Sequence, residues 1–562
     1  MNKKIVIGSA AAASIVIILI LMVGFVKMTS LSARTQIVGM DQLLSSEKGE
    51  ISRNDNYIPS SPSSVRTESD SSSKIKGIPS NGGYVGSYEK TEEQSGFDAM
   101  YFANYGTNVY IAPTTDSLST FGLDVDTASY TISKQYIMRG ELPPTDSVRA
   151  EEFINYFNYD YQNPTEEFGI YSEIANSPFE DDIKLLRIGI KSREVENRKH
   201  ATLTFVVDVS GSMNQENRIA LVKKSMKFLV EQLEVGDEIA IIKYNTNAEL
   251  VLSHTSVQEK QKILDAIDTL TPGGSTNAEA GLLLGYKTAS EVYNSELSNR
   301  VILLSDGVAN VGKTGPDAIL KEIEKYKAKG IGITTIGVGM GNYNDVLLEQ
   351  LADKGDGNYY YVNEFNEAKR VFQGQLTGTL ETIAKDAKVQ VDFNPETVSY
   401  YRLVGYENRA IADEEFRDDE KDAGEIGAGH EVTAIYEIKL TNLVETRNIG
   451  RVYMRYKNPD TDLPKEISHD ISGTIKNFNY VDDNFKLSIA VARYAQILKL
   501  SQPPTQIEAV FEIVDGIEKT DETIDDFKII LSNTKRLIEI KQGNSNQRFV
   551  EPSQKIEGES NE

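Results

Sequence analysis

Oxygen-bearing side chains gather in three short segments of this 562-residue chain. The segments are Asp208-Val209-Ser210-Gly211-Ser212, Gly273-Gly274-Ser275-Thr276-Asn277 and Ser305-Asp306-Gly307. Their carboxylates and hydroxyls are hard donors without thiolate or imidazole, so Mg2+ suits them best, with Mn2+ or Ca2+ as alternatives. Residues 208, 210 and 212 alternate along an extended loop and therefore face one way. The pattern predicts a metal site formed by Asp208, Ser210, Ser212, Thr276 and Asp306.

Each of these residues also has an ordinary structural explanation. The side chains at 208, 210 and 212 could cap the helix that follows them, and Thr276 could cap the helix that begins near Ala278. Asp306-Gly307 could form a turn. Their shared position at strand ends favours a metal instead. Five ligands of low total charge leave one coordination position open, which a carboxylate from a partner protein could fill.

The elements that must position these residues alternate between strand and helix. Apolar runs and helical spacing predict a doubly wound, mostly parallel sheet, in which ligands bind beyond the carboxyl ends of the strands. The expected strands are 201–208, 239–244, 301–305, 331–338 and 359–362. The expected helices are 219–233, 258–270, 278–293, 316–329, 343–353 and 364–384.

Taken together, the three segments resemble the metal-ion-dependent adhesion site of the von Willebrand factor type A (VWA) domain. Two later segments, Ile336–Gly339 and Leu351–Gly355, resemble that domain's later strand and turn. The resemblance covers about residues 200–385 and implies an α/β, Rossmann-like fold. It also implies that a bound metal bridges to an acidic side chain of a protein ligand. The alternative is a structural or assembly component of the cell envelope with a metal-stabilised VWA domain.

The resemblance extends beyond the VWA domain to a bacterial family of exported VWA proteins. The segments that carry it are STFGLDVDTASY (119–130), ELPPTDSVRAEEFINYFNYDY (141–161) and YRLVGYENR (401–409). That family has its own regions on both sides of the VWA domain. We therefore expect a family-specific N-terminal region at 97–199, the VWA domain at 200–385, a β-rich unit at 386–475, a helical region at 476–542 and a disordered tail at 543–562.

A phosphatase is a third hypothesis. Asp124-Val125-Asp126-Thr127 follows a predicted strand, and Asp124 could attack phosphorus. The threonine comes one place early for that motif, however, and a matching downstream Lys and acidic pair are not found in order. The aspartates and threonine of a helix start explain the motif equally well. The four histidines (His200, His254, His430 and His469) are scattered and form no zinc-hydrolase motif. We predict that the chain is not an enzyme.

The N-terminus predicts export. Residues Ile5 to Val26 form an uncharged apolar run whose roughly 22 residues span about 33 Å, enough for a bilayer core. Lys3 and Lys4 precede it, so the bulk of the chain should lie outside the membrane. A cleaved signal peptide, with Ser30-Leu31-Ser32 as its site, is the alternative. A serine-rich tether at 28–96 should then separate a transmembrane anchor at 1–27 from the head.

The net charge and the cysteine content exclude several classes of partner and binding site. Fifty-nine basic and 84 acidic residues give a net charge of −25, which opposes binding to nucleic acid. Cysteine is absent, so disulfides, thiolate metal sites and a lipid-modified N-terminal cysteine are excluded. The expected partners are a protein with an exposed Asp or Glu and, through the N-terminal helix, the membrane.

Overall fold

The computed structural model describes residues 102–543 except 124, 308–315, 340–344, 375–377, 379, 422, 442–447 and 520. The described residues fall within one unit of contacts, Thr91–Glu562. The apolar run Ile5–Val26, the tether at 28–96 and the tail beyond Gly543 lie outside the described residues. Among the helices that are described, none is both long and apolar enough to span a bilayer.

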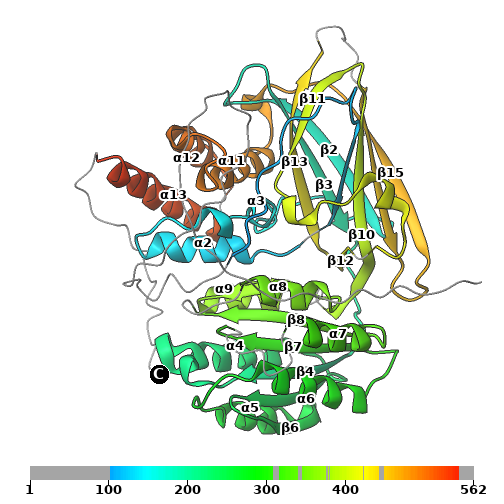
Figure 1. Ribbon diagram of the computed structural model, residues 1–562, viewed down its shortest axis with the longest axis vertical. Coiled ribbons are helices and arrows are strands. Elements are labelled where there is room, and N and C mark those ends of the chain that lie inside the picture. Colours follow the sequence, from blue (N-terminus) through cyan, green and yellow to red (C-terminus); the bar gives the residue numbers. More distant parts are fainter. Residues whose placement is uncertain are drawn as a thin grey trace, which may run out of the picture. The chain divides into compact units, whose positions relative to one another are not determined.

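A six-stranded sheet forms the centre of the VWA region, with the strand order β6-β5-β4-β7-β8-β9 (Figure 1). All neighbours pair in parallel except the edge strand β6, which runs antiparallel to β5. The strands are β4 (Ala201–Asp208), β5 (Glu238–Tyr244), β6 (Ala248–Ser256), β7 (Ser298–Ser305), β8 (Ile331–Val338) and β9 (Tyr359–Val362). Every residue of β4 is buried, as expected for a parallel strand covered on both faces. The predicted doubly wound sheet is confirmed; β6 was not predicted.

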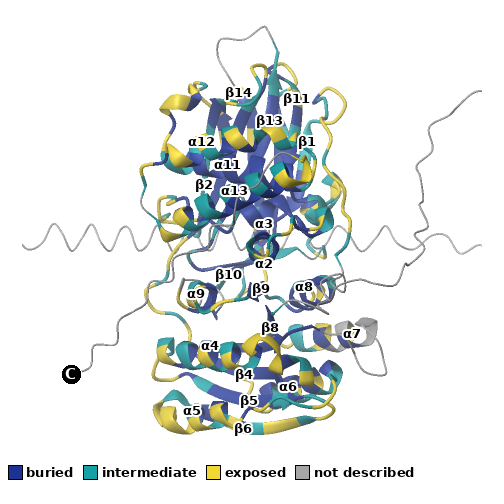
Figure 2. Ribbon diagram, turned by 90° about the vertical axis from the view of Figure 1, so that its left-hand side faces the viewer, coloured by how far each residue is buried: buried dark blue, intermediate teal, exposed yellow. Residues whose placement is uncertain are grey.

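Helices cover both faces of this sheet (Figure 2). On one face lie α4 (Arg218–Gln232), α5 (Lys260–Asp268) and α9 (Phe365–Lys369), which share a buried core with β4. On the other face lie α6 (Ala278–Glu291), α7 (Pro316–Lys327) and α8 (Asp345–Asp353). A helix from the N-terminal region, α2 (Ala128–Met138), adds Ala128, Ile132 and Tyr136 to this second core. The VWA sheet is thus partly covered by chain from outside the VWA region.

The long helix predicted over 364–384 is wrong at its C-terminal end. Helix α9 ends at Lys369, a short π-helix follows at Arg370–Gly374, and Thr382–Phe393 is a strand, β10. Ala384, Lys385 and Ala387 are good helix formers, which hid the strand in the sequence. Pairing of β10 with β1, β12 and β14 overrides that local preference.

Two antiparallel sheets enclose a third core, outside the VWA region. One has the order β1-β10-β14-β15, with β12 on β10, and the other has the order β11-β13-β3-β2. The strands are β1 (Leu118–Gly122), β2 (Phe168–Asn176), β3 (Lys184–Ser192), β11 (Val398–Val404), β12 (Gly424–Gly427), β13 (Glu431–Leu440), β14 (Asn448–Lys457) and β15 (Pro464–Ser472). Strands from the expected N-terminal region and from the expected β-rich unit therefore share both sheets. The predicted boundary positions remain predictions, but the two segments fold together.

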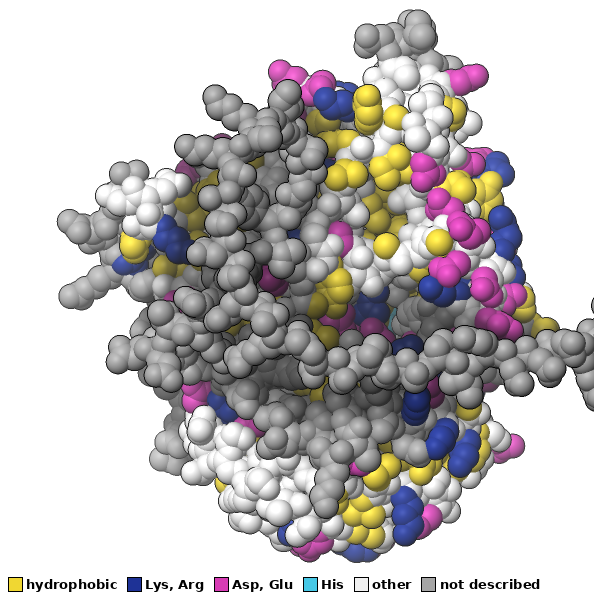
Figure 3. Space-filling view, in the orientation of Figure 1, with side chains coloured by type: hydrophobic (Ala, Val, Ile, Leu, Met, Phe, Trp, Pro, Cys, Tyr) yellow, Lys and Arg dark blue, Asp and Glu magenta, His cyan; other side chains and the backbone are white. Residues whose placement is uncertain are grey.

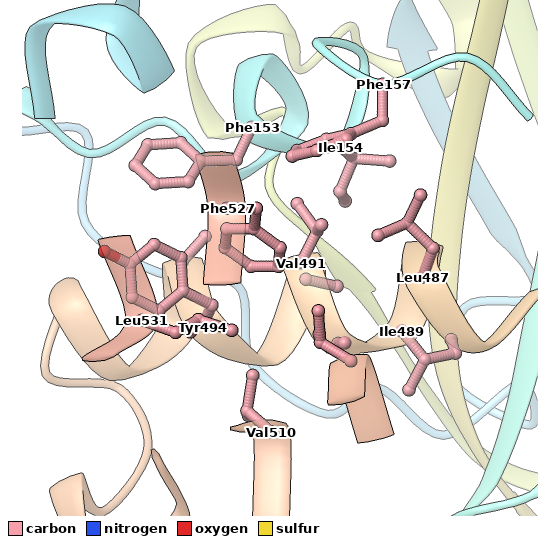
Figure 4. Packing of buried hydrophobic residues seen from close by; sticks show 14 of the residues in the cluster. Phe153, Ile154, Phe157, Leu487, Ile489, Val491, Tyr494, Val510, Phe527 and Leu531 are labelled. Carbon is pink, nitrogen blue, oxygen red and sulfur yellow. The ribbon is translucent and has the colours of Figure 1, made fainter. Parts of the chain in front are cut away.

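The C-terminal helices build a fourth core. They are α11 (Asp483–Leu498), α12 (Ile507–Asp515) and α13 (Glu522–Lys541), and they pack on α3 (Ala150–Ile154). Figure 4 shows Phe153 and Phe157 directed toward Phe527 and Tyr494. The rings of Phe157 and Tyr494 both lie 5.3 Å from that of Phe527, within the range of favourable aromatic contacts. The predicted C-terminal helices are confirmed, with α12 as an addition.

A buried ionic cluster attaches the N-terminal region to the VWA sheet. Arg149, which precedes α3, donates to Asp345 at the start of α8, with Nη1 2.6 Å from Oδ2. The same guanidinium pairs with Glu152 and lies 3.8 Å from Glu349. These four side chains are at most 5% exposed. Charges this deeply buried hold their partners in one geometry because separation would leave them unsolvated.

Candidate metal centre

The carboxyl ends of β4 and β7 meet at one edge of the VWA sheet. Asp208 is the last residue of β4, and Ser305 is the last residue of β7. The two strands pair in parallel, with Val207 opposite Leu304, so the segments that follow both strands emerge side by side. The fold therefore brings the first and third oxygen-rich segments together, as parallel pairing requires.

Four of the five predicted ligands lie in one chain of hydrogen bonds. The backbone N–H of Ser210 donates to Asp208 Oδ1 at 2.8 Å. The hydroxyl oxygens of Ser210 and Ser212 are 2.9 Å apart, and Ser212 donates to Asp306 Oδ1 at 3.0 Å. Ser212 and Asp306 are 94 residues apart in the sequence, so the fold brings them together. Hydrogen bonds of 2.8–3.0 Å therefore link these four residues into one cluster.

The carboxylate of Asp208 is fixed from the strand side. Ser305 donates to its Oδ2 at 2.9 Å, and the Tyr244 hydroxyl donates to the same oxygen at 3.2 Å. Tyr244 is the last residue of β5 and is fully buried. Three adjacent strand ends therefore contribute to holding this one side chain.

The loop that carries Thr276 is tied to the cluster through backbone hydrogen bonds of its glycines. The N–H of Gly211 donates to the Gly274 carbonyl at 3.0 Å, and the N–H of Gly273 donates to the Val209 carbonyl at 2.8 Å. These two bonds dock the loop at 271–277 against the first oxygen-rich segment. Thr276 itself is half-buried, and its hydroxyl makes no hydrogen bond within the described residues. Its part in a metal site stays a prediction.

The cluster contains two buried carboxylates. Asp208 is fully buried and Asp306 is 4% exposed. Burial, and next the neighbouring Asp306 carboxylate, raise the pKa of Asp208 to about 6, against the opposing effect of hydrogen bonds from Ser210 and Ser305. Two close carboxylates with hydroxyl neighbours form a hard donor set that fits Mg2+. Nowhere in the described residues does a group of three or more His, Cys, Asp or Glu side chains form that could hold a metal, and this cluster contributes only two carboxylates beside its hydroxyls.

The cluster has one further charged member, Arg218, which was not among the predicted site residues. Its Nη1 donates to Asp306 Oδ2 at 2.7 Å, and the side chain is 6% exposed. Arg218 is the first residue of α4, where the helix dipole disfavours a positive charge. An arginine at that position, six residues after a predicted ligand, was the available signal that a carboxylate lies near.

The residues of the phosphatase hypothesis have structural partners instead. Asp124 lies outside the described residues. Asp126 is buried and accepts from the backbone N–H of Tyr359 at 2.8 Å and from Arg409 at 3.2 Å. Thr127 precedes α2, but its side chain makes no capping bond and accepts from Arg370 instead, at 2.8 Å. Asp126 therefore joins the N-terminal region to strand β9.

Family models match most of the described chain. The model described as "von Willebrand factor type A domain" matches residues 202–374, and "Uncharacterized protein YfbK, C-terminal" matches residues 378–530. A third, described as "von Willebrand factor", matches residues 96–187. The VWA domain and the flanking regions expected from the sequence are thus both found.

Two curated relatives and one solved structure illustrate the similarity. The chain is 35% identical over 414 residues to the uncharacterized protein YfbK of Escherichia coli, covering 68% of this chain and 72% of that protein. It is 24% identical over 335 residues to the uncharacterized protein sll0103 of Synechocystis sp., covering 58% and 77%. A solved von Willebrand factor type A protein from Catenulispora acidiphila is 13% identical, with a TM-score of 0.38, and the match covers 67% and 98%. The extent of the first match shows that this chain belongs to the YfbK family of VWA-domain proteins.

Proposed function

We propose that the VWA domain binds Mg2+ at the strand edge and, through it, a carboxylate of a protein partner. The observation that carries the proposal is the hydrogen-bonded chain from Asp208 through Ser210 and Ser212 to Asp306. VWA domains as a class mediate protein interaction, which agrees with a binding role. A bound ion would supply positive charge that the partner's carboxylate can share.

Each residue of the chain has a role in this proposal. Asp208 and Asp306 supply negative charge, directly or through water, and Ser210 and Ser212 supply neutral oxygens. Thr276 completes the donor set from the neighbouring loop. Because the two carboxylates are buried, their attraction for a cation is screened less than it would be at an exposed acidic patch.

A second candidate is a structural or assembly role in the cell envelope, with the metal stabilising the VWA domain. The burial of Asp208 and Ser210 favours it, since these two donors are 0% and 1% exposed and are held by strand ends. Under this alternative, removing the metal lowers the stability of the VWA domain but does not affect the binding of any partner. We propose no phosphatase, because the described residues beside Asp124 serve as structural contacts.

We also propose that the protein is exported and held at the membrane by Ile5–Val26, with signal cleavage as the alternative. Lys3 and Lys4 before the apolar run support this orientation. The net charge of −25 opposes a nucleic-acid partner. On the face that Figure 3 shows, Lys and Arg side chains lie among Asp and Glu side chains. Protease added to intact, wall-stripped cells should degrade the head; full protection of the head would contradict the orientation.

The test of the binding function is capture of the partner from native membranes by the full-length chain, in Mg2+ and in EDTA. A protein retained in Mg2+ and released in EDTA is expected, and Asp208→Ala should abolish its retention. Thr276→Ala should weaken partner retention more than Mg2+ affinity. Asp265→Ala, which removes an exposed carboxylate from α5, is the matched control and should change neither. Equal retention in Mg2+ and EDTA would favour the structural alternative.

A further inference from the structure

Four side chains of alternating charge connect the candidate metal centre to a helix outside the VWA region. Asp306 pairs with Arg218 at 2.7 Å, and Arg218 Nη2 lies 3.6 Å from a carboxylate oxygen of Glu216. The other oxygen of Glu216 lies 3.2 Å from Arg139 Nη2. Arg139 is the C-cap residue of α2, a helix of the N-terminal region. The chain of charges therefore runs from a predicted metal ligand to a different part of the molecule.

Burial changes along this chain. The side chains of Asp306 and Arg218 are 4% and 6% exposed, whereas those of Arg139 and Glu216 are 28% and 50% exposed. The inner pair is screened little and should be strong, while the outer pair is weaker and can exchange. The exposed outer residues, Arg139 and Glu216, can therefore change the strength of the buried Arg218–Asp306 pair without being needed for the stability of the fold.

The backbone between the metal segment and α4 is held in an unusual conformation. Glu216 has φ +48° and Asn217 has φ +57°, so two consecutive non-glycine residues are left-handed, which is unfavourable for side chains with a Cβ. This kink reverses the chain so that the Glu216 carboxylate approaches Arg218, two residues ahead. On the other side, a Cβ at Gly339 would lie 2.2 Å from Arg218 Nε, so the end of β8 packs directly against the guanidinium group.

A guanidinium and a metal ion compete for the same carboxylate. Arg218 already gives Asp306 one positive charge, and a divalent cation nearby would be repelled by that charge at low effective dielectric. Glu216 attracts Arg218 away from Asp306, and Arg139 attracts Glu216. Arg218 should therefore lower the metal affinity of the site, Glu216 should raise it, and Arg139 should lower it again.

We propose that Arg218 is an internal competitor of the metal at Asp306, and that Arg139 on α2 sets, through Glu216, how readily Arg218 releases that carboxylate. The N-terminal region then regulates the metal affinity of the VWA domain. This inference rests on the proposed metal site.

The test is calorimetric titration of the full-length chain in detergent with Mg2+. Arg218→Met should raise Mg2+ affinity by about tenfold or more, because it removes a buried like charge. Arg139→Ala should raise it by about two- to fivefold and Glu216→Gln should lower it, as expected for partly exposed charges. Lys223→Ala is the control for net charge: it removes a cation from the same helix whose hydrogen bond goes to the Asp268 carbonyl. It should leave the affinity nearly unchanged.

A double-mutant cycle separates coupling from general electrostatics. Arg139→Ala should have no effect on Mg2+ affinity in the Arg218→Met background. An equal effect of Arg139→Ala in both backgrounds, or no tighter binding by Arg218→Met, would overturn the proposal. If Arg218→Met does not fold, the cycle of Arg139→Ala with Glu216→Gln uses surface residues alone and should show the same loss of effect.

The outcomes also separate this inference from the metal site on which it rests. If the wild type binds Mg2+ but the effects of Arg139→Ala and Arg218→Met on affinity simply add, only the proposed regulation is overturned. Binding by Arg218→Met but not by the wild type would support a centre held shut by Arg218. No binding by either would overturn both. As a second readout, melting in EDTA should show Arg139→Ala nearly as stable as the wild type, since a merely structural role would lower stability instead.

Discussion

At the scale of single residues, the pKa of Asp208 in the candidate metal centre departs from its ordinary value. Burial and Asp306 raise its pKa from 3.8 to about 6. Between these values the folded state binds more protons than the unfolded state, so this residue makes stability fall as pH rises. Above pH 6 the ionised carboxylate costs about 3 kcal/mol in the absence of metal. A divalent cation would offset that cost, which links metal binding to pH.

Replacing Asp208 by Asn should therefore stabilise the metal-free protein. In EDTA at pH 7.5 we expect Asp208→Asn to raise the free energy of unfolding by about 1–3 kcal/mol, because it removes a buried charge. At pH 4.5 the carboxyl is protonated in the folded state but still mostly ionised in the unfolded state, so the difference should fall to about a third of its value at pH 7.5. Urea unfolding at both pH values measures this, with the exposed Asp265→Asn as control. Lower stability of Asp208→Asn at pH 7.5 would contradict the assigned electrostatics.

The sequence predicted four of the clustered residues because their spacing and strand-end positions are local features. Asp208, Ser210 and Ser212 alternate over five positions, and the parallel sheet brings Asp306 beside them. Arg218 could not be assigned to Asp306, because that contact joins residues 88 apart in the sequence and depends on the kink at Glu216.

At the scale of elements, the loop at 271–277 has to hold Thr276 beside the first oxygen-rich segment. Gly274 enables this with φ +87°, a left-handed conformation that a side chain with a Cβ adopts at a cost. A Cβ there would also lie 3.0 Å from Thr246 Oγ1. Its neighbour Gly273 has no atom within 4 Å of its Cβ position and no left-handed φ. Position 274 therefore requires glycine, whereas position 273 does not.

Gly274→Ala should destabilise the protein by about 1–2 kcal/mol, since a left-handed alanine is strained. It should also weaken Mg2+ binding, because the loop that carries Thr276 would shift. Gly273→Ala is the matched control and should change stability by less than about 0.5 kcal/mol. Thermal unfolding and Mg2+ titration of both variants measure this. Equal effects of the two substitutions would show that the left-handed turn does not position the loop.

Element types followed from periodicity where one preference dominated. The apolar run of β4 and the helical spacing of α4 were recognisable from the sequence. The first half of strand β10, from Thr382, was not, because it contains good helix formers and its identity comes from pairing with distant strands. Strand β6 was missed because it is an exposed edge strand, and its polar residues conceal the alternation.

At the scale of the whole molecule, the chain on both sides of the VWA region folds together. Strand β13 pairs with β3, and Glu431 lies opposite Lys191. The whole VWA region lies between these two residues in the sequence. No local pattern predicts such pairing, and the segments that share these two sheets are therefore separate units in the sequence-based prediction. The Arg149 cluster then joins this assembly to α8 of the VWA domain.

Arg149→Met should destabilise the protein by about 3–5 kcal/mol, because it leaves the buried carboxylates of Glu152 and Asp345 without their cation. Arg417→Ala is the matched control: it breaks an ion pair with Glu466 in which the arginine is 59% exposed. That change should cost no more than about 1 kcal/mol. Urea unfolding compares the two. Similar small losses in both variants would mean that the buried cluster contributes little to joining the two parts.

The central claim, that the strand edge of the VWA domain binds a divalent cation, is tested most directly by calorimetric titration of the full-length chain with Mg2+. The wild type should bind one Mg2+, and the triple variant Ser210→Ala, Ser212→Ala, Asp306→Ala should show no binding at the same concentrations. The triple variant removes three donors and one negative charge but leaves Asp208 and the strand ends in place. Unchanged Mg2+ affinity in the triple variant would contradict the assignment of the site.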